Sequence, residues 1–237
     1  MFRVPEGSVG ASVVTLDGPE GHHAADVRRL RVGESIWLTD GQGARGAGAV
    51  VAVRRGSLDV EVADWSTDQP ASPRLVVAQA LAKGGRDEAA VEAMTEIGVD
   101  EVIGWQASRS VAKWTERTGA KWESVSRAAA RQSRRAWWPT VTGPVSTPEL
   151  ATRVRDADLA VVLHESAAWS ISALELSNAG VVLVVVGPEG GVSEDELAAF
   201  VAAGAQPVRL GDTVLRSSTA GVAALAAILA RTRWTWI

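Results

Sequence analysis

Three short runs of almost wholly apolar residues constrain the fold of this chain more than any other feature. They cover residues 75–80, 159–163 and 181–186 and are rich in Val and Leu. Strands that face water on one side alternate apolar and polar residues, whereas continuous apolar runs are typical of strands buried on both faces. Between and after them lie the further strand candidates 101–105 and 207–210 and helical segments at 87–97, 115–136, 194–203 and 219–231. This alternation predicts an α/β domain, in which helices cover both faces of a parallel sheet.

The first 65 residues have a different texture. Short segments rich in β-branched residues are separated by turn signals such as Asp40-Gly41 and Arg55-Gly56. The strand candidates are residues 12–16, 35–38, 48–53 and 58–62, interrupted by a helical segment at 21–30. The polar stretch 66–73 holds two prolines and is typical of a linker. We therefore predict a small β-barrel domain over residues 1–70 and the α/β domain over residues 71–237.

Ligands of an open parallel sheet bind beyond the C-terminal ends of its strands. Residues 187–191, called the GPEGG turn below, follow one such end and contain three glycines, which let the backbone approach a ligand closely. A tight turn between a strand and a helix explains this spacing equally well, because a capping box at residues 193–196 begins the next helix. No phosphate-loop motif is present, and Glu189, taken as a free acid, disfavours a pyrophosphate ligand.

Arg216 occupies an unusual place, just before the expected N-terminus of the last helix. A positive charge there opposes the helix dipole, so it brings no evident structural benefit. An exposed arginine on the surface is one interpretation. The other is that Arg216 faces a site and holds a polar or anionic group.

Composition excludes several kinds of site. The chain has no cysteine, so disulfides, thiolate metal sites and cysteine nucleophiles are absent, and a reducing cytoplasm is the expected location. The three histidines are not spaced as a metal set, and we expect no metal. The apolar runs fall short of the roughly 20 residues that span a bilayer, and the start lacks the apolar core of a signal peptide. The net charge of −4 argues only mildly against nucleic-acid binding, which depends on local basic patches.

The order of several short motifs carries a resemblance to a known family. The motifs are the GPEGG turn, Leu210-Gly211, Leu215-Arg216, Thr219-Ala220, Lys83 with residues 95–99 (Thr-Glu-Ile-Gly-Val), Arg109-Ser110-Val111, Gln132-Ser133 with Arg135 and Pro139, and Phe2-Arg3 with His23 and Val27-Arg28. Together they resemble the SPOUT-class methyltransferases, and specifically the RsmE-type 16S ribosomal RNA (uracil-N3) methyltransferases. Arg131 and Ser218 stand where this family usually has glutamates, and Arg134 where it has a glycine, so no role of those residues is transferred.

The resemblance implies a PUA-like RNA-binding barrel and a SPOUT domain with a trefoil knot. It also implies S-adenosylmethionine as cofactor, a homodimer, and N3 of a uridine in 16S rRNA of the small ribosomal subunit as the target. The implied cofactor-binding residues are Leu163, His164, Glu165, Gly187, Pro188, Glu189, Gly190, Gly191, Leu210, Gly211, Leu215, Arg216 and Ser217. Glycine-rich and leucine-rich loops suit a neutral adenosine, and an acidic rim of Glu165 or Glu189 tolerates a sulfonium.

Uracil N3 must lose a proton before it attacks a methyl group, and a cation beside the base stabilises the negative charge that develops. Arg216 is the predicted catalytic residue for this role, while no residue is an obvious general base. The predicted RNA contacts are Arg3, Arg28, Arg29, Lys83, Arg109, Arg131 and Arg135. Arg127, Arg131, Arg134 and Arg135 fall on one side of the expected helix 115–136, which is either a phosphate-binding stripe or a solvated face.

Two other functions stay open on the sequence alone. The first is a knotted methyltransferase that acts on another RNA, for example at a ribose hydroxyl. The second is a non-catalytic RNA-binding protein that kept the fold, which the Ser218 departure leaves open. A hydrolase built on His164 and Glu165 is disfavoured because no serine stands in a nucleophile elbow.

Overall fold

The computed structural model describes residues 1–177 and 179–235. Asn178, Trp236 and Ile237, part of the predicted domain 71–237, lie outside the described residues. Contacts between residues divide the chain into two compact units. Unit 1 consists of Met1–Pro70 together with Arg131–Trp138, and unit 2 of Ala71–Ala130 together with Pro139–Ile237.

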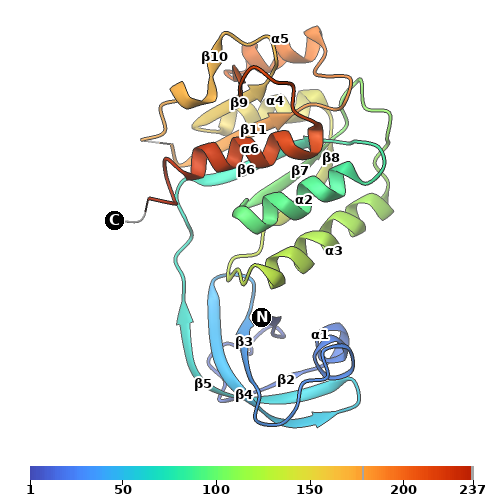
Figure 1. Cartoon of the computed structure of the whole chain (residues 1–237), viewed down its shortest axis with the longest axis vertical. Helices are drawn as coiled ribbons and strands as arrows, with labels where there is room; N and C mark the ends of the chain where they lie inside the picture. Colours follow the sequence, from blue (N-terminus) through green and yellow to red (C-terminus); the bar gives the residue numbers. More distant parts are fainter. Residues whose placement is uncertain (178, 236–237) are drawn as a thin grey trace. The chain divides into compact units, whose positions relative to one another are not determined.

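A parallel sheet forms the centre of unit 2 (Figure 1). Its strands are β6 (Arg74–Ala80), β7 (Glu101–Trp105), β8 (Thr140–Val145), β9 (Leu159–Leu163), β10 (Trp169–Ser170), β11 (Val181–Val186) and β12 (Gln206–Arg209). They lie in the order β10-β12-β9-β11-β6-β7-β8, and each neighbouring pair is parallel. The predicted α/β class with a parallel sheet is confirmed.

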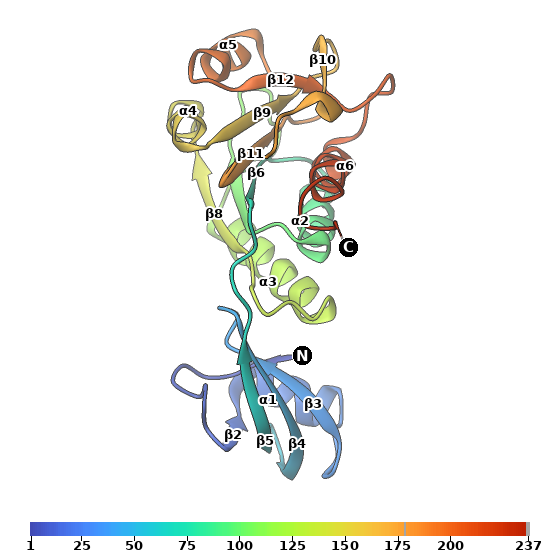
Figure 2. The same cartoon turned by 90° about the vertical axis from the view of Figure 1, so that its left-hand side faces the viewer.

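Helices cover both faces of this sheet (Figure 2). On one face lie α2 (Arg86–Ile97), α3 (Glu116–Gln132) and α6 (Ser217–Leu229), and on the other α4 (Thr147–Asp156) and α5 (Glu194–Ala202). Successive residues of β11 divide between the two cores, with Val182 and Val184 in the first and Leu183 and Val185 in the second. Because strand residues alternate between faces, two covered faces require an apolar residue at every position.

The last helix returns to the middle of the sheet. After β12, which pairs with β9, the chain runs back to α6, and α6 contacts β11, β6 and α2. A Cβ added at Gly221 would lie 2.7 Å from Met94 Sδ, so the glycine lets α6 approach α2 closely. The chain thus crosses from the β12 side of the sheet back to the two central strands β11 and β6.

β8 and α4 were not predicted from the sequence. β8 is half-exposed to exposed along its length and contains Gly143 and Pro144, so it lacks the apolar pattern of its neighbours. α4 begins with a capping box in which the main-chain nitrogen and hydroxyl of Ser146 each donate to Glu149 Oε2 at 2.7 Å. The spacing of Ser146 and Glu149 is a capping-box signal that can be read from the sequence and that predicts the start of this helix.

The prediction of a helix over residues 115–136 was wrong at its C-terminal end. α3 ends at Gln132, and Arg134 has a φ of 56°, in the left-handed region that a helix cannot continue through. The segment Arg131–Trp138 belongs to unit 1. There Thr39 Oγ1 donates to the Ala136 carbonyl at 3.2 Å, and Trp137 Nε1 donates to the Asp68 carbonyl at 3.0 Å. These contacts in unit 1 override the helical preference of the sequence.

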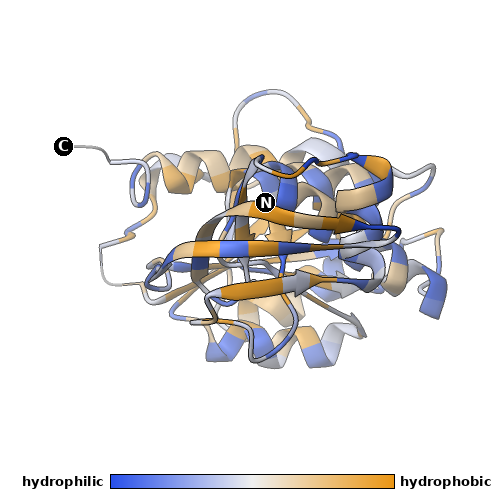
Figure 3. Ribbon diagram, turned by 90° about the horizontal axis from the view of Figure 1, so that it is seen from below, coloured by the Kyte–Doolittle hydropathy of each residue, from blue (hydrophilic) through white to orange (hydrophobic). Residues whose placement is uncertain are grey.

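Unit 1 is built on a curled sheet in the order β1-β3-β4-β5-β2. Its elements are β1 (Phe2–Arg3), β2 (Val13–Leu16), β3 (Ser35–Thr39), β4 (Ala44–Arg54), β5 (Ser57–Thr67), α1 (Gly18–His22) and a π-helical turn, η1 (His23–Val27). Buried and more exposed residues alternate along β2 and the first half of β5, as a one-sided core requires, and hydrophobic and hydrophilic segments adjoin in this sheet (Figure 3). β5 runs through Thr67, so the predicted linker 66–73 is partly strand.

A close approach holds α1 on this sheet. A Cβ at Gly21 would lie 2.5 Å from the Gly56 carbonyl oxygen and 2.6 Å from that of Leu16, so no other residue fits there. α1 begins at Gly18, three residues before the predicted segment 21–30, and its glycine lets it pack directly on the strands.

Among the residues that the structure describes, no helix is long and apolar enough to cross a membrane.

Candidate functional site

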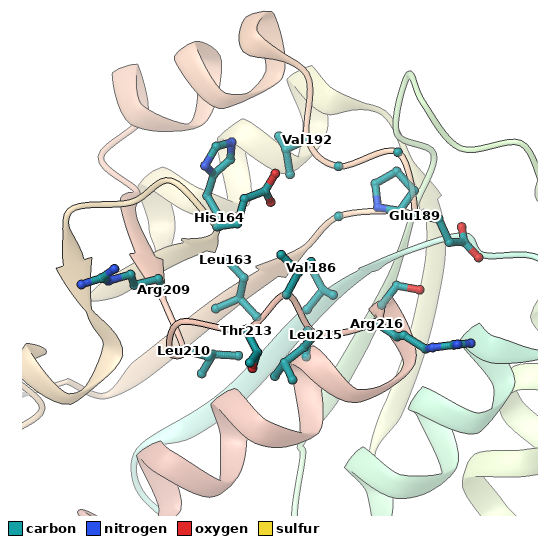
Figure 4. Close-up of a pocket in the computed structure, with 18 of the residues that line it drawn as sticks. Leu163, His164, Val186, Glu189, Val192, Arg209, Leu210, Thr213, Leu215 and Arg216 are labelled. Atoms are coloured by element: carbon teal, nitrogen blue, oxygen red, sulfur yellow. The ribbon is translucent and has the colours of Figure 1, made fainter.

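A cavity of about 460 Å³ lies beyond the C-terminal ends of β9, β11 and β12 (Figure 4). This is where a parallel sheet binds its ligands, and the volume is that of a small-molecule site. Every residue predicted to bind the cofactor lines it: Leu163, His164, Glu165, Gly187, Pro188, Glu189, Gly190, Gly191, Leu210, Gly211, Leu215, Arg216 and Ser217. The fold thus brings together three loops that are far apart in the sequence.

The GPEGG turn requires its glycines. A Cβ at Gly187 would lie 2.9 Å from Val192 Cγ2 and 3.1 Å from the Val192 nitrogen. Gly191 has a φ of 73°, and its nitrogen donates to the Pro188 carbonyl at 2.9 Å. Glycine is therefore needed at one position for space and at the other for conformation. The expected capping box follows, because Ser193 Oγ donates to Glu196 Oε2 at 2.9 Å and accepts from the Glu196 nitrogen at 3.3 Å.

Glu189 is not the free acid that the sequence analysis assumed. Its Oε1 accepts a hydrogen bond from the Lys83 nitrogen at 3.2 Å and lies 3.4 Å from Arg86 Nη1. In Figure 4 its carboxylate points away from Leu163 and His164. The residue therefore ties the turn to the start of α2, and the exposed Glu165 is the acid left at the rim.

The opposite wall is the loop of residues 210–216, whose apolar side chains are Leu210, Val214 and Leu215. Val214 is 76% exposed and Leu215 38% exposed, and both line the cavity. Thr213 and Val214 belong to the predicted loop but were not singled out in it, and the lining residues that were not predicted are Val186, Val192, Val208, Arg209 and Ala220. Most of these sit at strand ends or beside the predicted loops, so extending each loop by one or two residues identifies them.

Arg216 is the N-cap residue of α6, as its position before a helix predicted. Its carbonyl accepts hydrogen bonds from the nitrogens of Thr219 and Ala220, each at 2.9 Å. Within the described residues its exposed guanidinium has no hydrogen-bond or ion-pair partner, and it points outward at the rim (Figure 4). The neighbouring Ser217 hydroxyl is buried and, in the same described part of the chain, has no hydrogen-bond partner. A buried unpaired hydroxyl in a cavity wall is satisfied most simply by a ligand.

The histidine at the end of β9 has a local role. His164 Nδ1 accepts from the Ser166 nitrogen at 3.3 Å, and the His164 nitrogen donates to the Val208 carbonyl at 3.0 Å. These bonds shape the strand end. Across residues 1–177 and 179–235, no group of His, Cys, Asp or Glu is arranged to hold a metal ion.

Arg109, predicted to contact RNA, lies in the cavity wall. Its Nη1 donates to the Gly190 carbonyl at 3.0 Å, and a Cβ at Gly190 would lie 3.2 Å from Arg109 Cβ. The arginine therefore packs over the GPEGG turn. Lys83 contributes its main-chain nitrogen to that turn, and its side chain is exposed.

The remaining predicted RNA contacts belong to unit 1: Arg3, Arg28, Arg29, Arg131 and Arg135. Arg28 and Arg29 are exposed. The Arg3 guanidinium lies 5.6 Å from the centre of the Trp138 ring and donates from Nε to the Asp40 carbonyl at 3.2 Å.

The prediction of a four-arginine stripe on one helix was wrong. Arg134 and Arg135 lie beyond the end of α3, and Arg127 pairs with Glu123 at 3.1 Å. Arg131 forms an ion pair with Glu20, so it is not the free phosphate contact that the stripe required. The half-buried Arg135 accepts a hydrogen bond at its carbonyl from Trp138 Nε1 at 3.0 Å.

Arginines nevertheless create a positive field in unit 1. Burial, followed by the charges of Arg28, Arg131 and Arg134, lowers the pKa of the amino group of Met1. The pKa of His23 is lowered by burial and by Arg131, while Glu20 opposes the shift. Arg28 and Arg131 act on both groups, and with Arg134 and the exposed Arg29 we call them the basic patch of unit 1, in a chain of net charge −4.

Comparisons with known families match both units. The RNA methyltransferase domain family matches residues 69–229, and the RNA methyltransferase PUA domain family matches residues 16–63. The ribosomal RNA small subunit methyltransferase E of Mycobacterium tuberculosis is 46% identical over 232 residues, which cover 94% of this chain and 88% of that protein. The Bacillus subtilis protein of the same name is 30% identical over 230 residues, covering 92% of this chain and 90% of that protein.

Solved structures agree with these matches. A methyltransferase from Legionella pneumophila with bound S-adenosylmethionine superposes with a TM-score of 0.86 and 26% identity, covering 97% of this chain and 96% of that one. The ribosomal RNA small subunit methyltransferase E of Neisseria gonorrhoeae, also bound to S-adenosylmethionine, has a TM-score of 0.87 at 24% identity, covering 99% and 98%. At that identity the second structure establishes the fold alone.

Proposed function

The chain belongs to the ribosomal RNA small subunit methyltransferase E family, and from this premise we propose that it transfers the methyl group of S-adenosylmethionine to N3 of a uridine in 16S rRNA. The observation that carries the proposal is the cavity, which all thirteen residues assigned to the cofactor line. The catalytic domain is proposed to span residues 71–237 and the RNA-binding domain residues 1–70.

The cavity residues fit this cofactor chemically. Main-chain groups of the GPEGG turn and of the 210–216 loop suit the polar edge of an adenine, and Leu163, Leu210 and Leu215 suit its faces. The buried Ser217 hydroxyl offers a hydrogen bond that nothing else in the described chain takes up. Glu165, exposed at the rim, provides negative charge for a sulfonium.

Arg216 is the residue proposed to act on the target base. The cofactor, when bound, supplies an electrophilic methyl group. Loss of the N3 proton leaves a negative charge on the uracil ring, and a guanidinium without a competing carboxylate stabilises that charge. Arg216 meets the condition, because it lies exposed at the rim with no ion-pair partner among the described residues. Since N3 lies on the Watson–Crick edge, the uridine must be unpaired or turned out of its helix.

The basic patch of unit 1 is proposed to bind rRNA phosphates. Arg28 and Arg29 are exposed, and Arg3 presents its guanidinium beside the Trp138 ring. In unit 2, Lys83 and Arg109 stand at the GPEGG turn, where RNA that delivers the base must pass. Arg131 and Arg135 are the other two residues predicted to contact RNA. Both are partly buried within unit 1, so they support RNA binding through the structure of that unit and not by direct contact with phosphates.

Two further features belong to the proposal. We expect a homodimer, because Val214 and Leu215 are apolar and exposed at the open side of the cavity that they line, so a second copy would bury them. Analytical ultracentrifugation of the wild type beside a Val214→Asp variant tests the dimer, because a charge at this position should dissociate it.

We also place the protein in the cytoplasm, where ribosomal subunits are assembled.

Calorimetric titration with S-adenosylmethionine tests the enzyme against its non-catalytic alternative. The proposal predicts saturable binding by the wild type and weaker binding by Ser217→Ala, which removes the unpaired hydroxyl. An RNA-binding relative without catalytic function needs no such affinity. Absence of cofactor binding by the folded wild type would overturn the proposal in favour of that alternative.

A further inference from the structure

A buried carboxylate joins three of the loops that leave the sheet near the cavity. Glu196, the third residue of α5, is 5% exposed. Its Oε1 accepts from the Ser108 nitrogen at 2.7 Å and from Thr147 Oγ1 at 3.2 Å, and its Oε2 accepts from the Ser193 nitrogen at 3.1 Å. These partners follow β7, β8 and β11, so one side chain connects the C-terminal ends of three strands.

The glutamate is held as a carboxylate. Burial raises the pKa of Glu196, but the hydrogen bonds from Ser108 and Ser193 outweigh burial and hold the pKa below its ordinary value. A carboxylate accepts at both oxygens, whereas an amide of the same shape accepts at only one. The arrangement therefore depends on the charge of Glu196 as well as on its size.

Arg109 passes this connection on to the GPEGG turn. It follows Ser108 directly, and its Nη1 donates to the Gly190 carbonyl at 3.0 Å. Its Nη1 also lies 3.9 Å from the position of a Cβ on Gly191. On the same segment, Ser110 Oγ donates to the Leu81 carbonyl at 3.2 Å, which fixes the far end of the loop.

We propose that Glu196 is a positioning residue that acts through Ser108 and Arg109 to hold the GPEGG turn in its ligand-binding shape. An ordinary capping box needs only the contacts between Ser193 and Glu196, so it does not explain the bonds to Ser108 and Thr147. The inference rests on the proposed function, because it assigns the turn to cofactor binding. Glu196 itself is not among the residues that line the cavity.

The chain contains a matched control. Glu149 occupies the same capping-box position in α4 and accepts from Ser146 at 2.7 Å, but it is exposed and, among the residues that the structure describes, bonds only within its own box. Glu149→Gln and Glu196→Gln therefore remove the same kind of cap, and only the second also releases Ser108. The comparison separates helix capping from positioning of the turn.

The test measures S-adenosylmethionine affinity of the full chain by calorimetry at a temperature where each variant is folded. Glu196→Gln should weaken binding about tenfold, as expected for the loss of a charged hydrogen bond, while Glu149→Gln should bind like the wild type. Arg109→Ala should weaken binding similarly. The double variant Arg109→Ala/Glu196→Gln should lose no more than the larger single loss, because both act on one contact. Equal binding by the two glutamine variants, or losses that add, would overturn the inference.

Hydrogen exchange of the Gly191 amide gives a second readout that needs no cofactor. This amide is bonded to the Pro188 carbonyl, so it reports the shape of the turn. Glu196→Gln should speed its exchange and Glu149→Gln should not. Failure of the wild type to bind the cofactor would contradict the proposed function, while unchanged exchange in Glu196→Gln contradicts the positioning role. If Glu196→Gln does not fold, Arg109→Ala decides: unchanged exchange of Gly191 in that variant overturns the inference.

Discussion

Arg131, in the last turn of α3, forms an ion pair with Glu20 of α1, and both residues belong to unit 1. The side chains are 24% and 21% exposed, so the pair is largely withdrawn from water. Glu20 also accepts a hydrogen bond from the Arg3 nitrogen at 3.2 Å. These contacts hold the segment 131–138 on unit 1. The first role of Arg131 is therefore to stabilise the structure of unit 1, and its contribution to RNA binding depends on that structure.

Removal of the Arg131 charge should destabilise the protein. In Arg131→Gln, Oε1 of Glu20 loses its charged partner in a partly buried place, so we expect a loss of about 2 kcal/mol in the free energy of unfolding. Urea denaturation measures this loss. The control is Arg127→Gln, whose pair with Glu123 is exposed at 55% and 49% and should contribute less than about 0.5 kcal/mol. Equal effects of the two substitutions would contradict the structural role of Arg131.

His23 should titrate below its ordinary pKa. Burial and then the charge of Arg131 lower the pKa of His23, while Glu20 raises it. The neutral ring is thus favoured in the folded state, and stability declines as the pH falls below the ordinary histidine value. Proton NMR should show an upward shift of the His23 pKa in Arg131→Gln and a downward shift in Glu20→Gln. Binding of an RNA oligonucleotide should raise this pKa, because phosphates favour the charged ring. A His23 pKa at or above the ordinary value in the free protein would contradict the positive field.

Gly187→Ala should disturb the GPEGG turn. The new Cβ meets Val192 Cγ2 at 2.9 Å, so the turn must move and cofactor affinity should fall about tenfold or more. Val192→Ala removes that methyl group and should restore part of the affinity in the double variant. Calorimetry on the two single variants and the double variant measures the coupling. Purely additive losses would show that the contact with Val192 is not the cause.

Arg28→Gln should weaken RNA binding by reducing phosphate contacts. Each contact removed lowers the slope of the logarithm of the binding constant against the logarithm of salt concentration by about one. Arg54→Gln is the control, since Arg54 already pairs with Asp59 at 2.8 Å. Fluorescence anisotropy with a 16S rRNA fragment over a range of salt gives both slopes. An unchanged slope for Arg28→Gln removes this arginine from the RNA interface.

The sequence predicted those parts of the fold that depend on local pattern. β11 could be predicted because both of its faces are buried, and the GPEGG turn because glycines stand between a strand and a capping box. β8 was not predicted because it lies at one edge of the sheet and is half-exposed to exposed, so no apolar pattern is required there. The C-terminal end of α3 was not predicted because contacts between residues almost a hundred positions apart determine it, such as the hydrogen bond from Thr39 to Ala136.

The site divides in the same way. The three loops that line the cavity could be predicted, because each directly follows a strand of a parallel sheet. The pairing of Glu189 with Arg86, and that of Glu196 with Ser108, join residues 103 and 88 positions apart. Such contacts have no local signal, so a carboxylate that is bound in the fold looks free in the sequence.

The central claim is tested most directly by methyl transfer to the proposed substrate. Small ribosomal subunits from a strain that lacks this methyltransferase are incubated with the purified protein and with S-adenosylmethionine that carries a labelled methyl group. The rRNA is then digested to nucleosides, and mass spectrometry identifies the nucleoside that carries the label. The proposed function predicts label in 3-methyluridine, about one group per subunit, with transfer strongly reduced in Arg216→Ala. Label in any other nucleoside, or no transfer by a folded protein that binds the cofactor, would contradict it.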